Sequence, residues 1–185
     1  MILPIVAFGD AVLRKKAENI TNDYKALPQL INDMFETMYN ANGVGLAAPQ
    51  IGLAIRLFVI DASPFAEDEK ELENFKRVFI NAQILDEAGE AWKFNEGCLS
   101  IPGVREDVLR KPDITITYLD ENFDSKTEKF SGLAARIIQH EYDHIEGILF
   151  TDKLNPLRKR MIKGKLNDIS NGKVNVDYRM RFIRK

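Results

Sequence analysis

The sequence is poor in the residues on which disulfides and multiple metal sites depend, since its 185 residues include one cysteine and two histidines. A single cysteine, Cys98, excludes an intramolecular disulfide, and a free thiol is typical of a reducing compartment. No apolar run approaches the roughly 20 residues that cross a bilayer. The first ten residues lack the basic segment of a signal peptide. We therefore expect a cytoplasmic protein without membrane contact.

Length and charge indicate one domain with a basic tail. At 185 residues and 45% hydrophobic composition, the chain can bury one sizeable core but is short for two. The formal net charge is −2, yet residues 151–185 hold eleven Lys or Arg against three Asp or Glu. We expect a single domain over residues 1–185 with a basic C-terminal extension at about 152–185. That extension can contact a polyanion, although a solvated helix face is the commoner explanation.

Hydrophobic periodicity and end signals predict both helices and strands. Helical spacing predicts helices over residues 27–38, 131–148 and 153–168. Alternating or β-branched runs predict strands over residues 55–61, 77–85, 113–119 and 174–183. Ser131 can cap the second helix and Gly147 can end it. Because the strands come in runs, with helices between the groups, we expect an α+β fold with antiparallel pairing.

The most informative run, His-Glu-Tyr-Asp-His at residues 140–144, lies within the second predicted helix. Histidines four residues apart differ by about 40° around a helix of 3.6 residues per turn, so both rings can bind one metal ion. Glu141 lies near enough to move a proton on a water beside that ion. The plain alternative is two polar histidines on an amphipathic helix. Against it, these are the only histidines in the chain, and the glutamate stands where a general base is needed.

A catalytic metal site of this kind needs a third protein ligand, and the chain has no third histidine. Cys98 lies in Glu-Gly-Cys-Leu-Ser at residues 96–100, whereas a structural cysteine more often lies in an apolar run. Together with His140 and His144, it would leave a fourth position for water, as catalytic sites require. A buried, inert thiol is the alternative.

A run of small residues, Gly-Val-Gly-Leu-Ala-Ala-Pro-Gln at residues 43–50, lets the backbone approach another chain closely. Its last residue, Gln50, can donate a hydrogen bond to a developing oxyanion. The run lacks the Lys-Ser/Thr end of a phosphate loop and does not lead from a strand into a helix. Taken alone, it indicates a plain turn.

Together, these three runs resemble the peptide deformylase family. Its members carry Gly-x-Gly-x-Ala-Ala-x-Gln, Glu-Gly-Cys-Leu-Ser and Gln-His-Glu-x-Asp-His in this order, and all three are intact at residues 43–50, 96–100 and 139–144. Asp-Ala-Val-Leu-Arg at residues 10–14 matches the family's Asp-x-x-Leu-Arg, and the resemblance reaches residue 150. It implies antiparallel β-sheets that surround a central helix bearing the two histidines.

The resemblance also implies a role for each site residue. The metal ligands would be Cys98, His140 and His144. Glu141 would take a proton from water and pass it to the departing amine. The side chain of Gln50 and the backbone N–H of Leu99 would stabilise the oxyanion. Glu96 and Arg110 match a paired acid and base that we expect to be structural.

An extended substrate adds like a strand in this family, and backbone groups of Val44, Gly45 and Gly97 would bind it here. Arg105 matches an arginine near the substrate mouth, with surface solvation as the alternative. The positions that line the methionine pocket in relatives correspond to Val44, Phe94, Leu133, Ile137 and the ring of His140. An unbranched thioether suits such an apolar slot.

The resemblance also implies a metal and an activity, and the residues alone leave alternatives to both. A Cys-His-His-water set suits zinc, whereas the resemblance implies ferrous iron in the cell, with zinc or nickel able to substitute. The implied substrates are formylated nascent peptides, from which formate would be released. The alternatives are a zinc endopeptidase and a non-catalytic, metal-stabilised nucleic-acid-binding module. As an enzyme, the chain would use its basic tail to contact ribosomal RNA electrostatically, without reading a nucleic-acid sequence.

Overall fold

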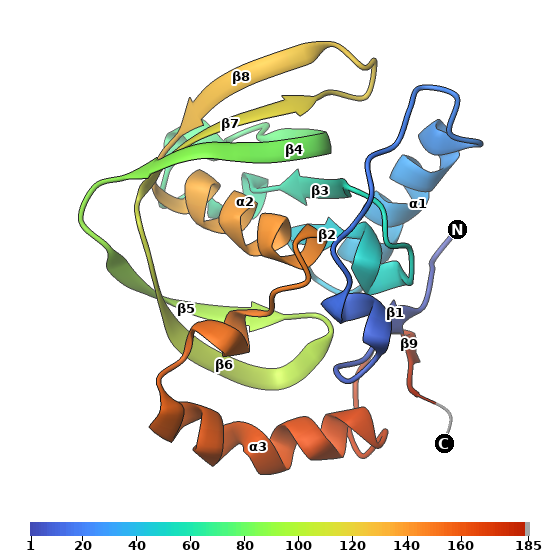
Figure 1. Cartoon of the computed structure of the whole chain (residues 1–185), viewed down its shortest axis with the longest axis vertical. Coiled ribbons are helices and arrows are strands. Elements are labelled where there is room, and N and C mark those ends of the chain that lie inside the picture. The colour runs from blue at the N-terminus through green and yellow to red at the C-terminus, as the bar shows by residue number, and fades with distance from the viewer. Residues whose placement is uncertain (184–185) are drawn as a thin grey trace.

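In the computed structural model, which describes residues 1–183, a central helix lies between two β-sheets (Figure 1). This helix, α2 (Gly132–Ile145), carries the His-Glu-x-x-His run. A five-stranded sheet lies on one side of α2, and a two-stranded hairpin lies on the other. Two further helices, α1 (Leu27–Asn40) and α3 (Pro156–Ser170), lie outside these layers. The predicted α+β architecture, with antiparallel sheets around a central helix, is confirmed.

The five-stranded sheet supplies the apolar surface against which α2 packs. Its strands, in spatial order, are β2 (Gly45–Ala47), β3 (Leu57–Asp61), β4 (Lys76–Ala88), β7 (Asp113–Leu119) and β8 (Ser125–Phe130), and all neighbours are antiparallel. Side chains alternate between the faces of a strand, so Ile114, Ile116 and Tyr118 of β7 are buried on one face. They share a hydrophobic cluster with Ala135 and Ile138 of α2. This packing fixes how α2 is rotated about its axis.

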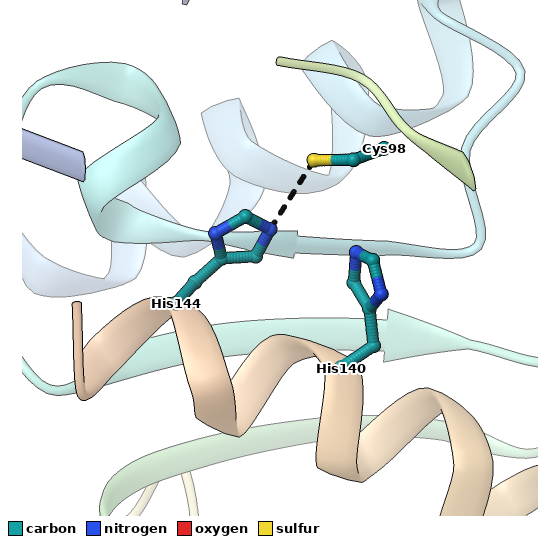
Figure 2. A group of neighbouring side chains, drawn as sticks. All are labelled: Cys98, His140 and His144. Carbon is teal, nitrogen blue, oxygen red and sulfur yellow. Dashed lines mark hydrogen bonds between the residues drawn. The ribbon is translucent and has the colours of Figure 1, made fainter. Parts of the chain in front are cut away.

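The two-stranded sheet is the hairpin of β5 (Trp92–Cys98) and β6 (Ile101–Arg110). Its register shifts at the tip, because Gly97 pairs with Arg105 whereas Cys98 pairs with Ile101. Such irregularities bend a strand and re-aim its side chains. The hairpin therefore presents Cys98 toward the histidines of α2 (Figure 2).

The two ends of α2 differ in how they are stabilised. Ser131 stands at the N-cap, but its side chain makes no capping hydrogen bond, contrary to the expectation from the sequence. Oε1 of Glu69 instead accepts a hydrogen bond from the backbone N–H of Leu133 at 3.2 Å. Gly147 follows the helix with φ +75°, as expected for a terminating glycine. A Cβ there would lie 2.7 Å from the carbonyl oxygen of Arg14, so the position requires glycine.

The last part of the chain packs back onto the body of the molecule. Ile162 and Ile169 of α3 are buried in a cluster that includes residues of β6. The strand predicted over residues 174–183 is wrong in extent, because only β9 (Met180–Arg181) pairs, parallel to β1 (Ile5–Val6). In the part of the chain described, no helix combines the length and apolar character needed to cross a membrane.

Candidate metal centre

Both histidines project from the same face of α2. Their ring centroids lie 5.2 Å apart, with the ring planes at 76°. The four-residue spacing causes this arrangement, because it returns the second side chain to nearly the same face one turn later. His144 is fully buried, whereas His140 is partly exposed to the cavity described below. The helix thus brings two imidazoles together, as the sequence predicts.

Cys98 completes a cluster of three possible metal ligands. Its Sγ atom lies 3.3 Å from Nε2 of His144 (Figure 2). The sulfur and one nitrogen from each ring all lie within 4.8 Å of one another. A thiolate and two imidazoles are ligands for zinc and for related transition metals, and three protein ligands leave a further position open. The donor set therefore fits one divalent ion.

A buried carboxylate orients the ring of His140. Nδ1 of His140 lies 2.9 Å from Oε2 of Glu96, which leaves Nε2 free to bind an ion. Arg110 donates two hydrogen bonds to Glu96, at 2.7 and 3.0 Å, and a third to Asp143 at 2.7 Å. The expected Glu96–Arg110 pair therefore exists and also holds a ligand in place.

The electrostatics of this cluster favour positive charge at His140 and oppose it at His144. Burial lowers the pKa of the His140 imidazole, but its hydrogen bonds to Cys98 and Glu96 outweigh burial and raise the value to about 10. Burial would raise the pKa of Glu96, but His140 and Arg110 hold it well below its usual range. Burial and the nearby His140 keep the pKa of His144 far below normal. A divalent cation meets the same demand for positive charge as the proton on His140.

Glu141 lies beside this cluster with spare hydrogen-bonding capacity. Its side chain is buried, and its Oε2 atom has no hydrogen-bond partner among residues 1–183. Burial raises the pKa of Glu141 to about 7, although the nearby His140 opposes the shift. A Cβ on Gly45 would lie 2.5 Å from Oε1 of Glu141, so the small residue at position 45 makes room for the carboxylate. A carboxyl group poised near neutral pH is suited to accept and return a proton.

Gln50 and Leu99 lie beside Cys98. The side-chain oxygen of Gln50, Oε1, accepts a hydrogen bond from the Ala47 N–H at 2.9 Å, which orients the side-chain amide. Its Nε2 atom consequently faces Sγ of Cys98 and Oγ of Ser100, each at 3.4 Å. Leu99 directly follows Cys98 at the hairpin tip. Two possible hydrogen-bond donors, a side-chain amide and a backbone N–H, therefore stand next to the sulfur.

A cavity of about 560 Å³ opens onto this cluster. Most of the residues predicted to contact substrate lie in its lining, namely Val44, Gly45, Phe94, Gly97, Arg105, Ile137 and His140. Leu133, one turn before Ile137 on α2, is not part of this lining and is buried in the hydrophobic cluster under the five-stranded sheet. Arg105 is held by Asn95 through hydrogen bonds of 2.9 and 2.7 Å.

Two parts of the site are missing from the predictions made on the sequence. Arg136 is buried and donates hydrogen bonds to Glu96 at 3.0 Å and to the carbonyl of Trp92 at 2.8 Å. Its place four residues before His140 was the available signal, since an arginine there must face the same side of the helix. The second part is Asn175–Tyr178, which lines the cavity from the C-terminal segment. No motif marks it in the sequence.

The chain resembles known proteins over nearly its whole length. Residues 2–160 match the family described as polypeptide deformylase. The peptide deformylase of Christiangramia forsetii is 65% identical, and that of Flavobacterium johnsoniae is 62% identical, each over 98% of this chain and 96% of the relative. The crystal structure of a peptide deformylase from Legionella pneumophila superposes with a TM-score of 0.81 at 40% identity, covering 94% of this chain and 98% of that one.

Proposed function

Because the chain belongs to the peptide deformylase family, we propose which of its residues carry out that family's reaction. The enzyme is a metal-dependent hydrolase that removes the formyl group from the N-terminal formylmethionine of new polypeptides and releases formate. The matched family, relatives and structures are deformylases, so they support neither a zinc endopeptidase nor a nucleic-acid-binding module.

We assign the metal ligands to Cys98, His140 and His144, and the native ion to Fe²⁺, with Zn²⁺ or Ni²⁺ able to substitute. The proximity of the three donor atoms, all within 4.8 Å of one another, carries the choice of ligands, whereas the choice of Fe²⁺ rests on the resemblance to the family. When bound, the ion polarises the formyl carbonyl and makes water more acidic. Glu96 fixes the ring of His140 by its 2.9 Å hydrogen bond, so the ligand keeps one orientation throughout the reaction.

Glu141 is the general base and then the general acid in this proposal. Its free Oε2 atom accepts a proton from the water that attacks the formyl carbon. The same proton then passes to the methionine nitrogen as the C–N bond breaks, so that formate and a free amine leave. A carboxyl pKa of about 7 suits both directions of transfer near neutral pH.

Gln50 and Leu99 stabilise the negative oxygen that forms during the attack. The amide of Gln50 is already oriented by Ala47, and the backbone of Leu99 is held through its carbonyl oxygen, which accepts a hydrogen bond from Tyr178. Donors that are held in place before the reaction need no reorganisation when charge develops. Removal of one such donor therefore slows the chemical step more than it weakens binding.

The substrate lies in the cavity as an added strand. Backbone groups of Val44, Gly45 and Gly97 bind its main chain. The methionine side chain lies against Phe94 and Ile137, two half-buried or buried apolar residues of the cavity wall, with Leu133 behind them. Arg105 lies at the mouth of the cavity, near the substrate's entry.

A metal-exchange experiment tests the assignment of the site. Protein purified without oxygen is stripped, reloaded with Fe²⁺, Zn²⁺ or Ni²⁺, and assayed for bound metal and for formate released from formyl-Met-Ala. We expect one ion per chain and formate release only from loaded protein. An unblocked peptide serves as the control and should remain intact. Equal formate release by the stripped protein would contradict the proposal, as would full metal content after replacement of Cys98 by Ala.

We further propose that residues 1–185 form one cytoplasmic catalytic domain whose basic extension contacts the ribosome. The exposed cations of α3 that support this contact are Lys159, Arg160, Lys163 and Lys165. Arg158 is less available, because it pairs with Glu106 through two 2.8 Å hydrogen bonds. Co-sedimentation with ribosomes should weaken as salt rises. Binding that is insensitive to salt would exclude an electrostatic contact.

A further inference from the structure

The C-terminal segment Val174–Phe182 follows a fixed path from α3 to the N-terminal strand (Figure 1). Burial alternates along the segment. The even-numbered residues, among them Val174, Val176 and Tyr178, are half-buried, and the odd-numbered residues are exposed. Its far end is tied to β1, since Ile5 N–H donates to the carbonyl of Arg179 at 2.9 Å. The segment is therefore anchored although only two of its residues pair as a strand.

Tyr178 joins this segment to the hairpin tip that carries Cys98. Its hydroxyl group donates a hydrogen bond to the carbonyl oxygen of Leu99 at 2.7 Å. On its other side, the Leu99 side chain packs against Gly43, where a Cβ would lie 2.8 Å from Leu99 Cδ1. Leu99 is thus held between the loop before β2 and the C-terminal segment.

The segment also forms part of the cavity wall. Asn175, Val176, Asp177 and Tyr178 line the same cavity as Cys98 and Glu141. Tyr178 packs with Leu99 in the cluster around α1, whereas Phe94 and Ile137 of the expected methionine pocket pack in the cluster around α2.

We propose that Asn175–Tyr178 form a subsite for the residue that follows the formylmethionine, clamped by the Tyr178–Leu99 hydrogen bond. The proposal rests on the proposed function, in which the substrate is an extended peptide. Successive side chains of an extended peptide point to opposite sides. A methionine directed toward Phe94 and Ile137 therefore directs the next side chain toward the opposite wall, where this segment lies.

The charge of this wall predicts which second residues it favours. Asp177 is exposed at the cavity and makes no ion pair within residues 1–183. Arg105, an exposed cation of the same lining, donates two hydrogen bonds to Asn95 on the hairpin. A lysine or arginine after the methionine can reach Asp177 while its methylene groups lie against Val176. A glutamate at that position meets a like charge.

The test compares second residues of opposite charge. Steady-state kcat/KM is measured at low salt for formyl-Met-Lys-amide, formyl-Met-Glu-amide and formyl-Met-Ala-amide. We expect wild type to prefer Lys over Glu and D177N to reduce that ratio by about two- to fivefold, with the Ala substrate as the uncharged reference. The control D168N removes the same charge from the exposed face of α3 and should keep the wild-type ratio. An unchanged ratio in D177N would overturn the subsite, whereas absence of formate release by wild type on all three substrates would overturn the proposed function itself.

A second variant tests the clamp. Y178F removes the hydroxyl group and should raise KM for formyl-Met-Lys-amide by about two- to tenfold, a larger rise than for formyl-Met-amide, which lacks a second residue. The control Y118F also loses a tyrosine hydrogen bond, to Glu128 on the outer sheet, and should leave both KM values unchanged. An equal rise in KM on both substrates would show that Tyr178 serves only general stability. Thermal unfolding confirms that each variant is folded.

Discussion

Nδ1 of His140 lies 2.9 Å from Oε2 of Glu96, and this hydrogen bond connects the proposed metal centre to two buried arginines. Glu96 accepts hydrogen bonds from Arg110 and Arg136 and also faces His140. The two guanidinium charges stabilise a buried carboxylate whose desolvation would otherwise be costly. The ring of His140 is oriented by a network that spans β5, β6 and α2. Metal affinity therefore depends on residues that do not touch the ion.

Replacing Glu96 by Gln tests this dependence. The glutamine cannot balance the two guanidinium groups and no longer fixes the His140 ring as strongly, so metal affinity should fall about 10- to 100-fold. Competition with a chelating dye measures the change. The matched control is Glu106→Gln, because Glu106 is also a buried carboxylate on the hairpin, but pairs with Arg158 of α3. Equal losses in both variants would show that the effect is general destabilisation.

Replacing Glu141 by Gln should separate proton transfer from metal binding. The amide has nearly the same shape but cannot accept the proton, so kcat for formate release should fall by about 10²- to 10⁴-fold. Metal content should remain that of wild type, because Glu141 is not among the three clustered donors. Formate assays and metal analysis on the same sample test both statements. Retained activity would remove Glu141 from the mechanism.

Gly45→Ala should impair the reaction through a steric contact. The new Cβ would lie 2.5 Å from Oε1 of Glu141, and a catalytic group displaced by about 1 Å can cost about 100-fold in rate. Gly164→Ala is the matched control in α3, where a Cβ meets nothing within 4 Å. It should leave activity unchanged and stabilise the helix by about 0.5–1 kcal/mol. Wild-type kinetics in the first variant would mean that Glu141 has room to move.

The ion pair between Arg14 and Asp152 should make stability depend on pH in the acid range. Burial tends to raise the pKa of Asp152, but hydrogen bonds from Arg14 and the Leu149 N–H lower it below its ordinary value. The folded state thus favours the ionised carboxyl, and its contribution is present above the unfolded pKa of about 3.9 and is lost as pH falls through the folded value. Both side chains are more than a third exposed, so solvent limits the effect to about 1 kcal/mol or less.

Urea unfolding of wild type and Asp152→Asn between pH 2 and pH 7 measures this contribution. The difference in unfolding free energy should be constant from pH 7 to about pH 5 and should shrink at lower pH. Arg14→Gln should reproduce the same profile, and the double variant should add little to either single change. A difference that grows on acidification would contradict the sign of the pKa shift.

Local sequence signals predict where a helix ends better than they predict whether a strand finds a partner. The helix over residues 27–38 was predicted within two residues of its observed end at Asn40, because apolar spacing and a following glycine loop are local signals. The strand over residues 174–183 was predicted too long, because alternation shows which side chains turn inward but not whether a partner strand is present. The place of Leu133 in the methionine pocket stays a prediction from the resemblance, since the residue is buried on α2 one turn from Ile137 and outside the cavity lining.

What the sequence by itself determined is the chemistry that one helix can carry. His140, Glu141 and His144 share a helix whose fixed pitch sets their mutual positions, so their role could be inferred before any contact was known. The tertiary structure decided the geometry with which Cys98 meets His144 and the contact of Tyr178 with Leu99. These contacts join segments 46 and 79 residues apart, and such distances depend on how sheets and helices pack rather than on any local preference of the backbone.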